Sequence, residues 1–253
     1  MLKTQTGTIK KDNTVIWRYM TKDKFQWLIE NSALYFPNIK QLKDSTNDPN
    51  DSLPSAETLT LLKMFKWPPN HLELFLREQL QYGISCWSAR KYESEHLWSK
   101  FNSCEGVAIK STVGKLNKSL DSIESLAKAI KYLPVSQDKQ QSYAPEDFLF
   151  IKDPYYSDEK EYRVLIKNEN QNSITIDLNL LIDEIVVGTE EDFNSILDIA
   201  ATCNMQDKVK HSCVYVDRSH NIHNTKSYWH TSEGLSEIEN LKIVIDNILK
   251  QLD

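Results

Sequence analysis

The chain is short of glycine, and it has no excess of positive charge. Only 6 of its 253 residues are glycine, and none of them belongs to a GxGxxG or GxxxxGK[ST] pattern. Those patterns let the backbone approach phosphate groups, so the sequence gives no support for a Rossmann or P-loop nucleotide site. The formal net charge of −6 argues against broad, non-specific binding of nucleic acid, which requires a basic surface. The net charge does not exclude a local basic groove.

Long apolar runs and clustered metal ligands are also missing. No run approaches the roughly 18 apolar residues of a membrane span, and the N-terminus has no charged-then-apolar leader. We therefore expect a cytoplasmic protein without membrane contact. The 4 cysteines show no CxxC spacing, so small core residues are favoured over zinc or redox roles. His220, His223 and His230 have no convincing third ligand, which favours a surface position over a metal site.

What is present is an irregular mixture of strand-like and helix-like segments. It predicts a single α+β domain whose central sheet is mixed or antiparallel, with a split sheet as one form, flanked by helices. Residues 1–13 are expected to be loose, 14–253 to form the domain, and 37–56 to form a long polar loop within it. Strands are expected at 14–20, 33–36, 83–88, 106–111, 173–178, 182–188 and 208–216, and helices after Thr21 and within 57–81, 93–101, 112–130, 190–203 and 236–252.

The most informative stretch runs from Phe148 to Lys167. An apolar run ends at Lys152, a proline corner follows, and a strand-like segment comes next. Because alternate residues of a strand share a face, Glu159, Glu161 and Arg163 are expected on one side, with Tyr162, Val164 and Ile166 on the other. A charged stripe of this kind is either a solvated sheet face with weak cross-strand ion pairs or a functional site.

Three short motifs connect this stretch to the rest of the chain. They are Trp17-Arg18-Tyr19 on the first strand, Cys86-Trp87-Ser88 on a middle strand, and Glu159-Lys160-Glu161 before Tyr162-Arg163. Together with Lys152, they make most of residues 15 to 216 resemble a bacterial family known only as a domain of unknown function. That resemblance implies no activity.

A more remote resemblance does imply one. The order arginine, serine and Glu-x-Glu, each on its own strand, resembles the arginine-serine-glutamate class of ADP-ribosyltransferases. It implies an ADP-ribosyltransferase-like fold, NAD as substrate, cleavage of the nicotinamide-ribose bond and transfer of ADP-ribose to a macromolecule or water, with bacterial phage defence as one setting. The class usually has a Ser-Thr-Ser-like strand, whereas Cys86-Trp87-Ser88 leaves one hydroxyl on the expected face.

Carried over by position, this resemblance gives each motif residue a role. Arg18 would contact NAD, Ser88 would support the nicotinamide-ribose pocket, Glu161 would be catalytic and Glu159 would help to activate the acceptor. The neighbouring residues expected to wall the NAD site are Tyr19, Trp87, Lys152, Tyr156 and Arg163. A fixed carboxylate suits this chemistry because cleavage builds positive charge on the ribose. A guanidinium suits the pyrophosphate because of its fork of donors.

Each of these residues also has a structural explanation, and other functions compete. Arg18 could stack on a neighbouring aromatic ring, and Ser88 could simply end a strand. A non-catalytic protein that binds a nucleotide or a partner in a stress or phage-defence system is the main alternative. A metal-dependent nuclease is least favoured, because no Asp…(Asp/Glu)-x-Lys arrangement occurs at strand spacing. The transferase hypothesis predicts that Arg18, Ser88 and Glu161 converge on one cleft.

Overall fold

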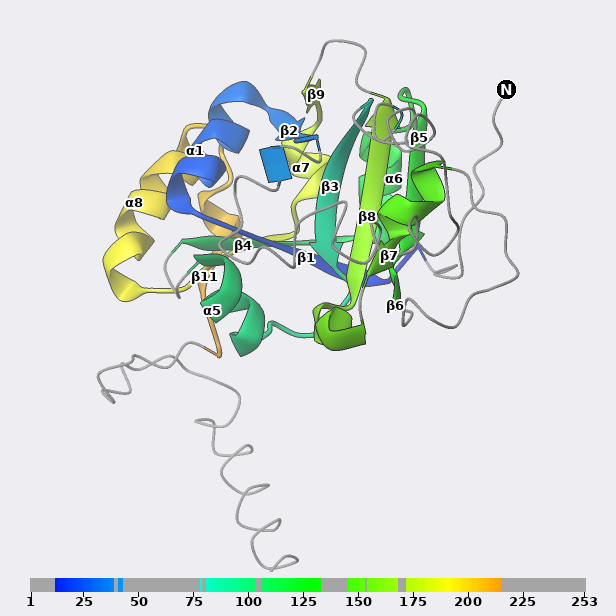
Figure 1. Ribbon diagram of the computed structural model, residues 1–253. Coiled ribbons are helices and arrows are strands. Elements are labelled where there is room, and N and C mark those ends of the chain that lie inside the picture. The colour runs from blue at the N-terminus through cyan, green and yellow to red at the C-terminus, as the bar shows by residue number, and fades with distance from the viewer. Residues whose placement is uncertain are drawn as a thin grey trace, which may run out of the picture.

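The computed structural model describes residues 12–38, 41–42, 78, 81–102, 106–132, 145–152, 154–167 and 172–214. Its centre is a seven-stranded sheet with the order β11-β10-β4-β1-β3-β8-β5 (Figure 1). Neighbouring strands are antiparallel except for β10 and β11, which run parallel. The predicted α+β fold with a central mixed sheet is therefore confirmed, while the domain boundaries stay a prediction.

The elements of the described residues follow in chain order. The central strands are β1 (Val15–Met20), β3 (Tyr82–Ser88), β4 (Val107–Thr112), β5 (Ser125–Ala129), β8 (Glu161–Lys167), β10 (Glu184–Val187) and β11 (Val209–His211). Two small sheets pair β2 (Ala33–Tyr35) with β9 (Ser173–Thr175), and β6 (Lys131–Tyr132) with β7 (Ile151–Lys152). The helices are α1 (Lys22–Asn31), α5 (Glu95–Asn102), α6 (Val113–Ser119), α7 (Leu178–Leu181) and α8 (Glu190–Ala201), with 3-10 turns η1 (Pro145–Phe150), η2 (Pro154–Glu159) and η3 (Gln206–Lys208).

The central sheet consists of two halves that meet at a narrow junction. β1 pairs with β4 along its whole length, and β3 pairs with β8 along its whole length. Between β1 and β3, however, the register contains one pair, Trp17 with Ser88. In Figure 1, β1 and β4 run across the view while β3 and β8 stand steeply. The sheet is thus one continuous sheet that narrows to a single register pair between β1 and β3, and Ser88 lies at this junction.

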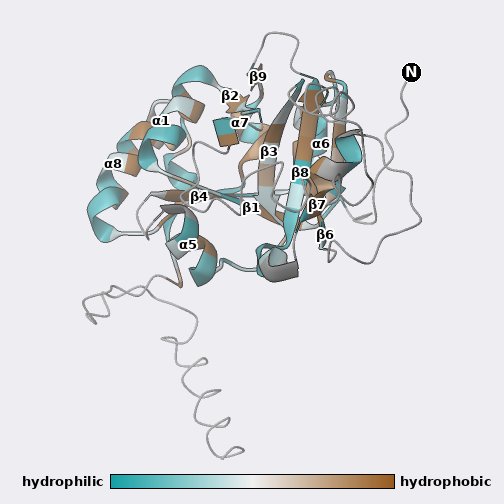
Figure 2. Ribbon diagram, in the orientation of Figure 1, coloured by the Kyte–Doolittle hydropathy of each residue, from teal (hydrophilic) through white to brown (hydrophobic). Residues whose placement is uncertain are grey.

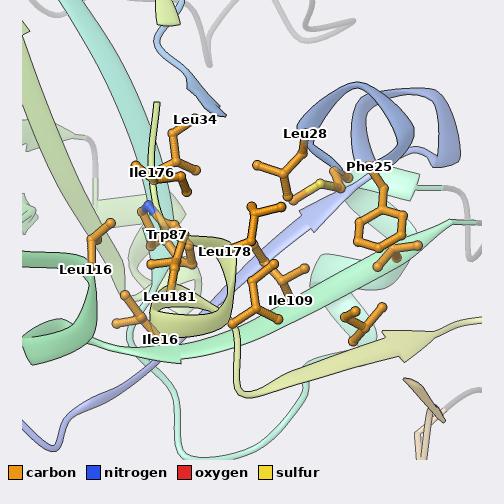
Figure 3. Packing of buried hydrophobic residues seen from close by; sticks show 14 of the residues in the cluster. Ile16, Phe25, Leu28, Leu34, Trp87, Ile109, Leu116, Ile176, Leu178 and Leu181 are labelled. Carbon is orange, nitrogen blue, oxygen red and sulfur yellow. The ribbon is translucent and has the colours of Figure 1, made fainter. Parts of the chain in front are cut away.

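One face of the sheet carries the largest apolar core. Ile16, Trp87 and Tyr162 point to this face and pack against residues of the helices and of the β2-β9 pair. Figure 3 shows Trp87 among Leu34, Ile176, Leu178 and Leu181; the last three come from the β9-α7 region. Burial of aromatic and aliphatic side chains of this size is the main stabilising contribution to such a core.

The opposite face carries two smaller apolar clusters. Trp98 of α5 packs with Trp17, Ala108 and Val186 over the β1 half. Over the β3 half, Leu149 and Phe150 of η1 pack on Tyr82, Ile84 and Leu165. β8 is hydrophilic where it begins and hydrophobic further along (Figure 2). Charged residues therefore lie at the start of β8 on this second face.

The structure corrects two predicted elements. The helix predicted over 112–130 is wrong beyond Ser119, because residues 125–129 form β5. Their local helix propensity is overridden by pairing with β8, which would otherwise be the edge of the sheet. The strand predicted over 173–178 ends at Thr175, and Asp177 caps α7 by accepting hydrogen bonds from the amides of Asn179 and Leu180.

Several predictions fall on residues outside the described ranges. These are most of the loop 37–56, nearly all of the helical region 57–81, the helix at 236–252, Cys104, and the histidines His220, His223 and His230. Within the described residues, no helix has the length and apolar character needed to cross a membrane.

Candidate functional site

The candidate site begins with a row of residues across three strands. Trp17 on β1 pairs with Ser88 on β3, and Ser88 pairs with Glu161 on β8. Directly opposed residues of neighbouring strands point to the same face. Ser88 and Glu161 are therefore side by side on the face that carries the smaller clusters, at the junction of the two half-sheets.

Glu161 is held by Arg163, its neighbour two residues along the same strand face. Arg163 Nε donates to Glu161 Oε1 at 2.6 Å, and Nη2 donates to Oε2 at 3.0 Å. The third guanidinium contact goes from Nη1 to the Leu149 carbonyl oxygen at 2.7 Å. Both side chains are buried, with 6% and 3% of their residues' surface exposed. A bidentate pair of this kind fixes the plane of the carboxylate.

The surroundings of Glu161 keep it ionised. Burial by itself would raise the pKa of the carboxyl, but the charges of Arg163 and Lys152 outweigh burial and lower the pKa to about 2. Hydrogen bonds from Arg163 and from the Cys86 thiol add to this effect. The backbone amide of Glu161 donates to the Tyr132 hydroxyl at 2.7 Å. At neutral pH the site therefore presents a fixed, negatively charged carboxylate.

Glu159 lies in the same region as Glu161, but it is not on the strand where it was expected. It lies at the end of η2, outside the strand, and is followed by Lys160 in the left-handed region with φ +45°. Lys100 Nζ donates to Glu159 Oε1 at 2.5 Å, and Lys152 Nζ donates to Oε2 at 2.7 Å. Glu159 is 4% exposed, so the alternative of a solvated charged stripe is wrong.

Tyr156 lies beside both lysines. Its ring centroid is 4.8 Å from Lys100 Nζ and 4.5 Å from Lys152 Nζ, within the range of cation–π attraction. Lys152 Nζ also lies 3.6 Å from Glu161 Oε2, which connects the two glutamates. We call the set of Lys100, Lys152, Tyr156, Glu159, Glu161 and Arg163 the charged cluster.

Ser88 ties β3 to the segment before β8. Its hydroxyl donates to the backbone carbonyl oxygen of Glu159 at 2.7 Å, and the residue is buried. The backbone amide of Ala89 donates to the Lys160 carbonyl oxygen at 2.8 Å. Ser88 therefore positions the chain that carries both glutamates, and its oxygen lone pairs retain the capacity to accept a hydrogen bond.

Arg18 does not join the charged cluster. It is adjacent to Trp17 on β1 and so points to the opposite face, where Nη1 donates to Ser85 Oγ at 3.1 Å and Nη2 to the Tyr35 carbonyl oxygen at 3.3 Å. Its guanidinium lies 5.8 Å from the Trp87 ring centroid. Burial lowers the pKa of Arg18, and no ion pair with a carboxylate is found for it within the described ranges. The predicted convergence of Arg18 with Ser88 and Glu161 is not found.

Two other predicted wall residues also lie away from the charged cluster. Trp87 is in the main core and donates its indole N–H to Ser85 Oγ at 3.0 Å. Tyr19 shares the face of Trp17, but its hydroxyl accepts from the Ser94 amide at 2.8 Å and its ring packs edge-on against Trp98 at 5.2 Å. Trp87 thus belongs to the main core, and Tyr19 supports the segment before α5 and α5 itself.

The structure adds residues that the sequence did not indicate. Lys100 comes from the last turn of α5, and Tyr132 comes from β6. Cys86, expected only as a core thiol, hydrogen-bonds Glu161, while Cys213 is exposed. A lysine on an amphipathic helix carries no local signal of such a contact, because most lysines at that position are solvated. Among the described residues, no group of three or more His, Cys, Asp or Glu side chains is arranged to hold a metal ion.

Comparison with known proteins gives a remote structural likeness. No family model and no curated protein matches the chain. DarT of Thermus sp. 2.9 in complex with NAD+ aligns over 76% of this chain and 90% of its own length, at 12% identity and a TM-score of 0.37. The same protein in complex with ADP-ribosylated ssDNA aligns over 80% of this chain and 92% of its own length, at 12% identity and a TM-score of 0.38. At these scores the likeness establishes neither a shared fold nor a shared activity.

Proposed function

We propose that the protein is an ADP-ribosyltransferase-like enzyme that cleaves NAD at the nicotinamide-ribose bond and transfers ADP-ribose to a macromolecule or to water. The observation that carries the proposal is the pairing of Ser88 with Glu161 across β3 and β8, with Glu161 buried, ionised and fixed in orientation. Arg18 takes no part in it. A setting in bacterial defence belongs to the same proposal.

Cleavage of the nicotinamide-ribose bond requires an ionised carboxylate in a fixed position. The bond between ribose C1′ and the nicotinamide nitrogen breaks, and its electron pair leaves with nicotinamide. A lone pair of the acceptor then bonds to C1′, and the acceptor's proton passes to a base or to solvent. Positive charge develops on the ribose in between, and an ionised carboxylate in a poorly solvated site stabilises that charge. Glu161 supplies the carboxylate, and Arg163 prevents it from rotating away.

The anionic part of NAD would meet cations on the same face. Those cations are Lys100, Lys152 and Arg163, and they replace Arg18 as candidates for contact with the pyrophosphate. Glu159 retains its proposed role toward the acceptor, since it lies two residues before Glu161 and shares Lys152 with it.

The direct test is release of nicotinamide from NAD by the purified protein. We expect release by the wild type and at least a hundredfold slower release by Glu161→Gln, which keeps the side-chain shape and removes the charge. Acceptors are compared by running the reaction with water alone, with a protein mixture and with single-stranded oligonucleotides. Equal rates for wild type and Glu161→Gln would reject the catalytic role of Glu161.

A second candidate function is binding of a nucleotide or partner without turnover. It is favoured by the position of Arg18 on the other face, and by the ion pairs that engage both carboxylates. Thermal-shift measurements with NAD, ADP-ribose and other nucleotides distinguish the two. Stabilisation together with nicotinamide release supports the enzyme, whereas stabilisation without release supports the binding protein.

A further inference from the structure

Two lysines of the charged cluster share one carboxylate. Lys100 and Lys152 bond opposite oxygens of Glu159 at 2.5 and 2.7 Å. Two ammonium groups bound to the same carboxylate are only a few ångströms apart, and Lys152 and Glu159 are largely removed from solvent. Because like charges this close repel strongly where water is scarce, the pair requires an anion between them. In this structure Glu159 supplies it.

The cations and the anion come from different kinds of element. Lys100 is on α5, and Lys152 is on β7. Glu159 instead ends the short 3-10 turn η2, next to a residue with a positive φ. Short 3-10 turns have poorer hydrogen-bond geometry than α-helices, and a non-glycine residue in the left-handed region is strained. Because Ser88 holds the backbone carbonyl of Glu159, the carboxylate would leave the lysines by rotation of its side chain.

Lys100 also gives the lysine pair a route to solvent. Its side chain is 20% exposed, compared with 9% for Lys152 and 5% for Glu159. An anion that arrives from solvent would therefore meet Lys100 first. A diphosphate presents oxygens to two ammonium groups as a carboxylate does, and its two phosphate groups together carry more negative charge than one carboxylate.

We infer that Lys100 and Lys152 form a phosphate-binding site that Glu159 occupies as an internal stand-in, and that the diphosphate of a nucleotide displaces Glu159 from it. The inference rests on the proposed function in taking the same face as the ligand site. Displacement has a second consequence: Glu159 becomes available as an acceptor-side base only when the diphosphate is bound. Binding of ligand and release of the carboxylate are then one event.

The test measures binding of inorganic pyrophosphate and of ADP-ribose by titration calorimetry. Glu159→Gln keeps the shape of the side chain and removes the competing charge, so it should bind pyrophosphate about tenfold more tightly than the wild type. Lys100→Met should weaken binding at least tenfold. Asp183→Asn is the matched control, because it removes one negative charge from an ion pair with Lys115 of α6, a helix that packs on the main core and not on the charged cluster. It should bind as the wild type does.

A second measurement covers the possibility that Glu159→Gln folds poorly. Without the Glu159 carboxylate the two ammonium groups lose the anion that they share, and only Lys152 keeps Glu161 at 3.6 Å, so the variant should melt at a lower temperature than the wild type. Pyrophosphate should then raise its melting temperature more than it raises that of the wild type. Equal or weaker binding by Glu159→Gln, or an equal or smaller gain in melting temperature, would overturn the inference.

The outcomes separate this inference from the proposed function. If Glu159→Gln gains pyrophosphate affinity while no variant releases nicotinamide, the phosphate site stands and the enzyme proposal fails. If the wild type releases nicotinamide but Glu159→Gln gains no affinity, the enzyme proposal stands and Glu159 is not a stand-in.

Discussion

Arg18 and Arg163 are two arginines of one sheet in contrasting surroundings. Arg163 makes a bidentate pair with the buried carboxylate of Glu161, and the charge of Glu161 overcomes burial and raises the pKa of Arg163. Arg18 bonds a serine hydroxyl and a backbone carbonyl, and burial lowers its pKa. The residue type is the same, and the face of the sheet decides its partner.

The comparison separates two uses of a buried cation. On the face of Arg163, opposite charges are assembled in a cluster whose members depend on one another. On the face of Arg18, a single cation is accommodated in an apolar core through neutral acceptors and an aromatic ring. Removal of one residue of the charged cluster should therefore lower the free energy of unfolding strongly, whereas removal of the Arg18 side chain should change it little.

The largest effect is expected for Arg163→Met. It leaves the Glu161 carboxylate buried without its main counter-charge, which costs about 3–5 kcal/mol of the free energy of unfolding. Urea denaturation of the variant measures this cost. The double variant Arg163→Met with Glu161→Met should recover most of it, because both charges are then absent. A single-variant cost below about 1 kcal/mol would show that the pair is not the centre of the cluster.

A somewhat smaller effect is expected from acid. The folded-state pKa of Glu161 is lowered from 4.5 to about 2, so its ionised form contributes stability above pH 4.5. That contribution, about 3 kcal/mol, is lost as the pH falls from 4.5 toward 2. The difference in unfolding free energy between wild type and Glu161→Gln should therefore shrink across this range. A difference that stays constant from pH 6 to pH 2 would contradict the lowered pKa.

A near-neutral effect is expected for Arg18→Met. The change removes two hydrogen bonds to neutral groups but also removes a charge from a poorly solvated position, so stability should change by at most about 1 kcal/mol. Nicotinamide release should stay within about twofold of the wild-type rate. A tenfold loss of nicotinamide release with an unchanged melting temperature would show that Arg18 takes part in the reaction. It would contradict the different roles assigned to the two faces of the sheet.

The smallest effect is expected for Lys160→Gly. Lys160 has φ +45°, a conformation that glycine adopts without steric cost, so the variant should be more stable by about 0.5 kcal/mol after the entropy of the unfolded chain is allowed for. Lys160→Ala is the control, because it removes the same side chain and keeps Cβ. Chemical denaturation should rank the glycine variant above the alanine variant, and the reverse order would contradict the strained turn.

The sequence predicted features that depend on local geometry. Glu161 and Arg163 are two residues apart, so any strand places them on one face whatever it pairs with. The irregular mixture of segments likewise predicted an α+β fold with a central sheet. The prediction of a helix over residues 125–129 was wrong, because a helical propensity of a few tenths of a kcal/mol per residue is weaker than pairing with β8.

The relation between Arg18 and Glu161 could not be predicted in this way. It depends on the register between β1 and β3, which pairs Trp17 with Ser88. A shift of one residue would reverse the face of every β1 side chain, and no single motif encodes that shift. Glu159 was likewise expected on the strand, but the left-handed Lys160 ends the alternation before it.

The sequence by itself therefore determined the strand from Glu161 onward, the alternation that pairs Glu161 with Arg163, and the mixed architecture, because each follows from neighbours along the chain. Only the tertiary structure decided that Ser88 faces Glu161, that Arg18 faces the core, and that Lys100 of α5 reaches Glu159. Ser88 and Glu161 are 73 positions apart in the sequence, and Lys100 and Glu159 are 59 apart, while the face of Arg18 depends on strand register, so packing of the whole sheet fixes all three.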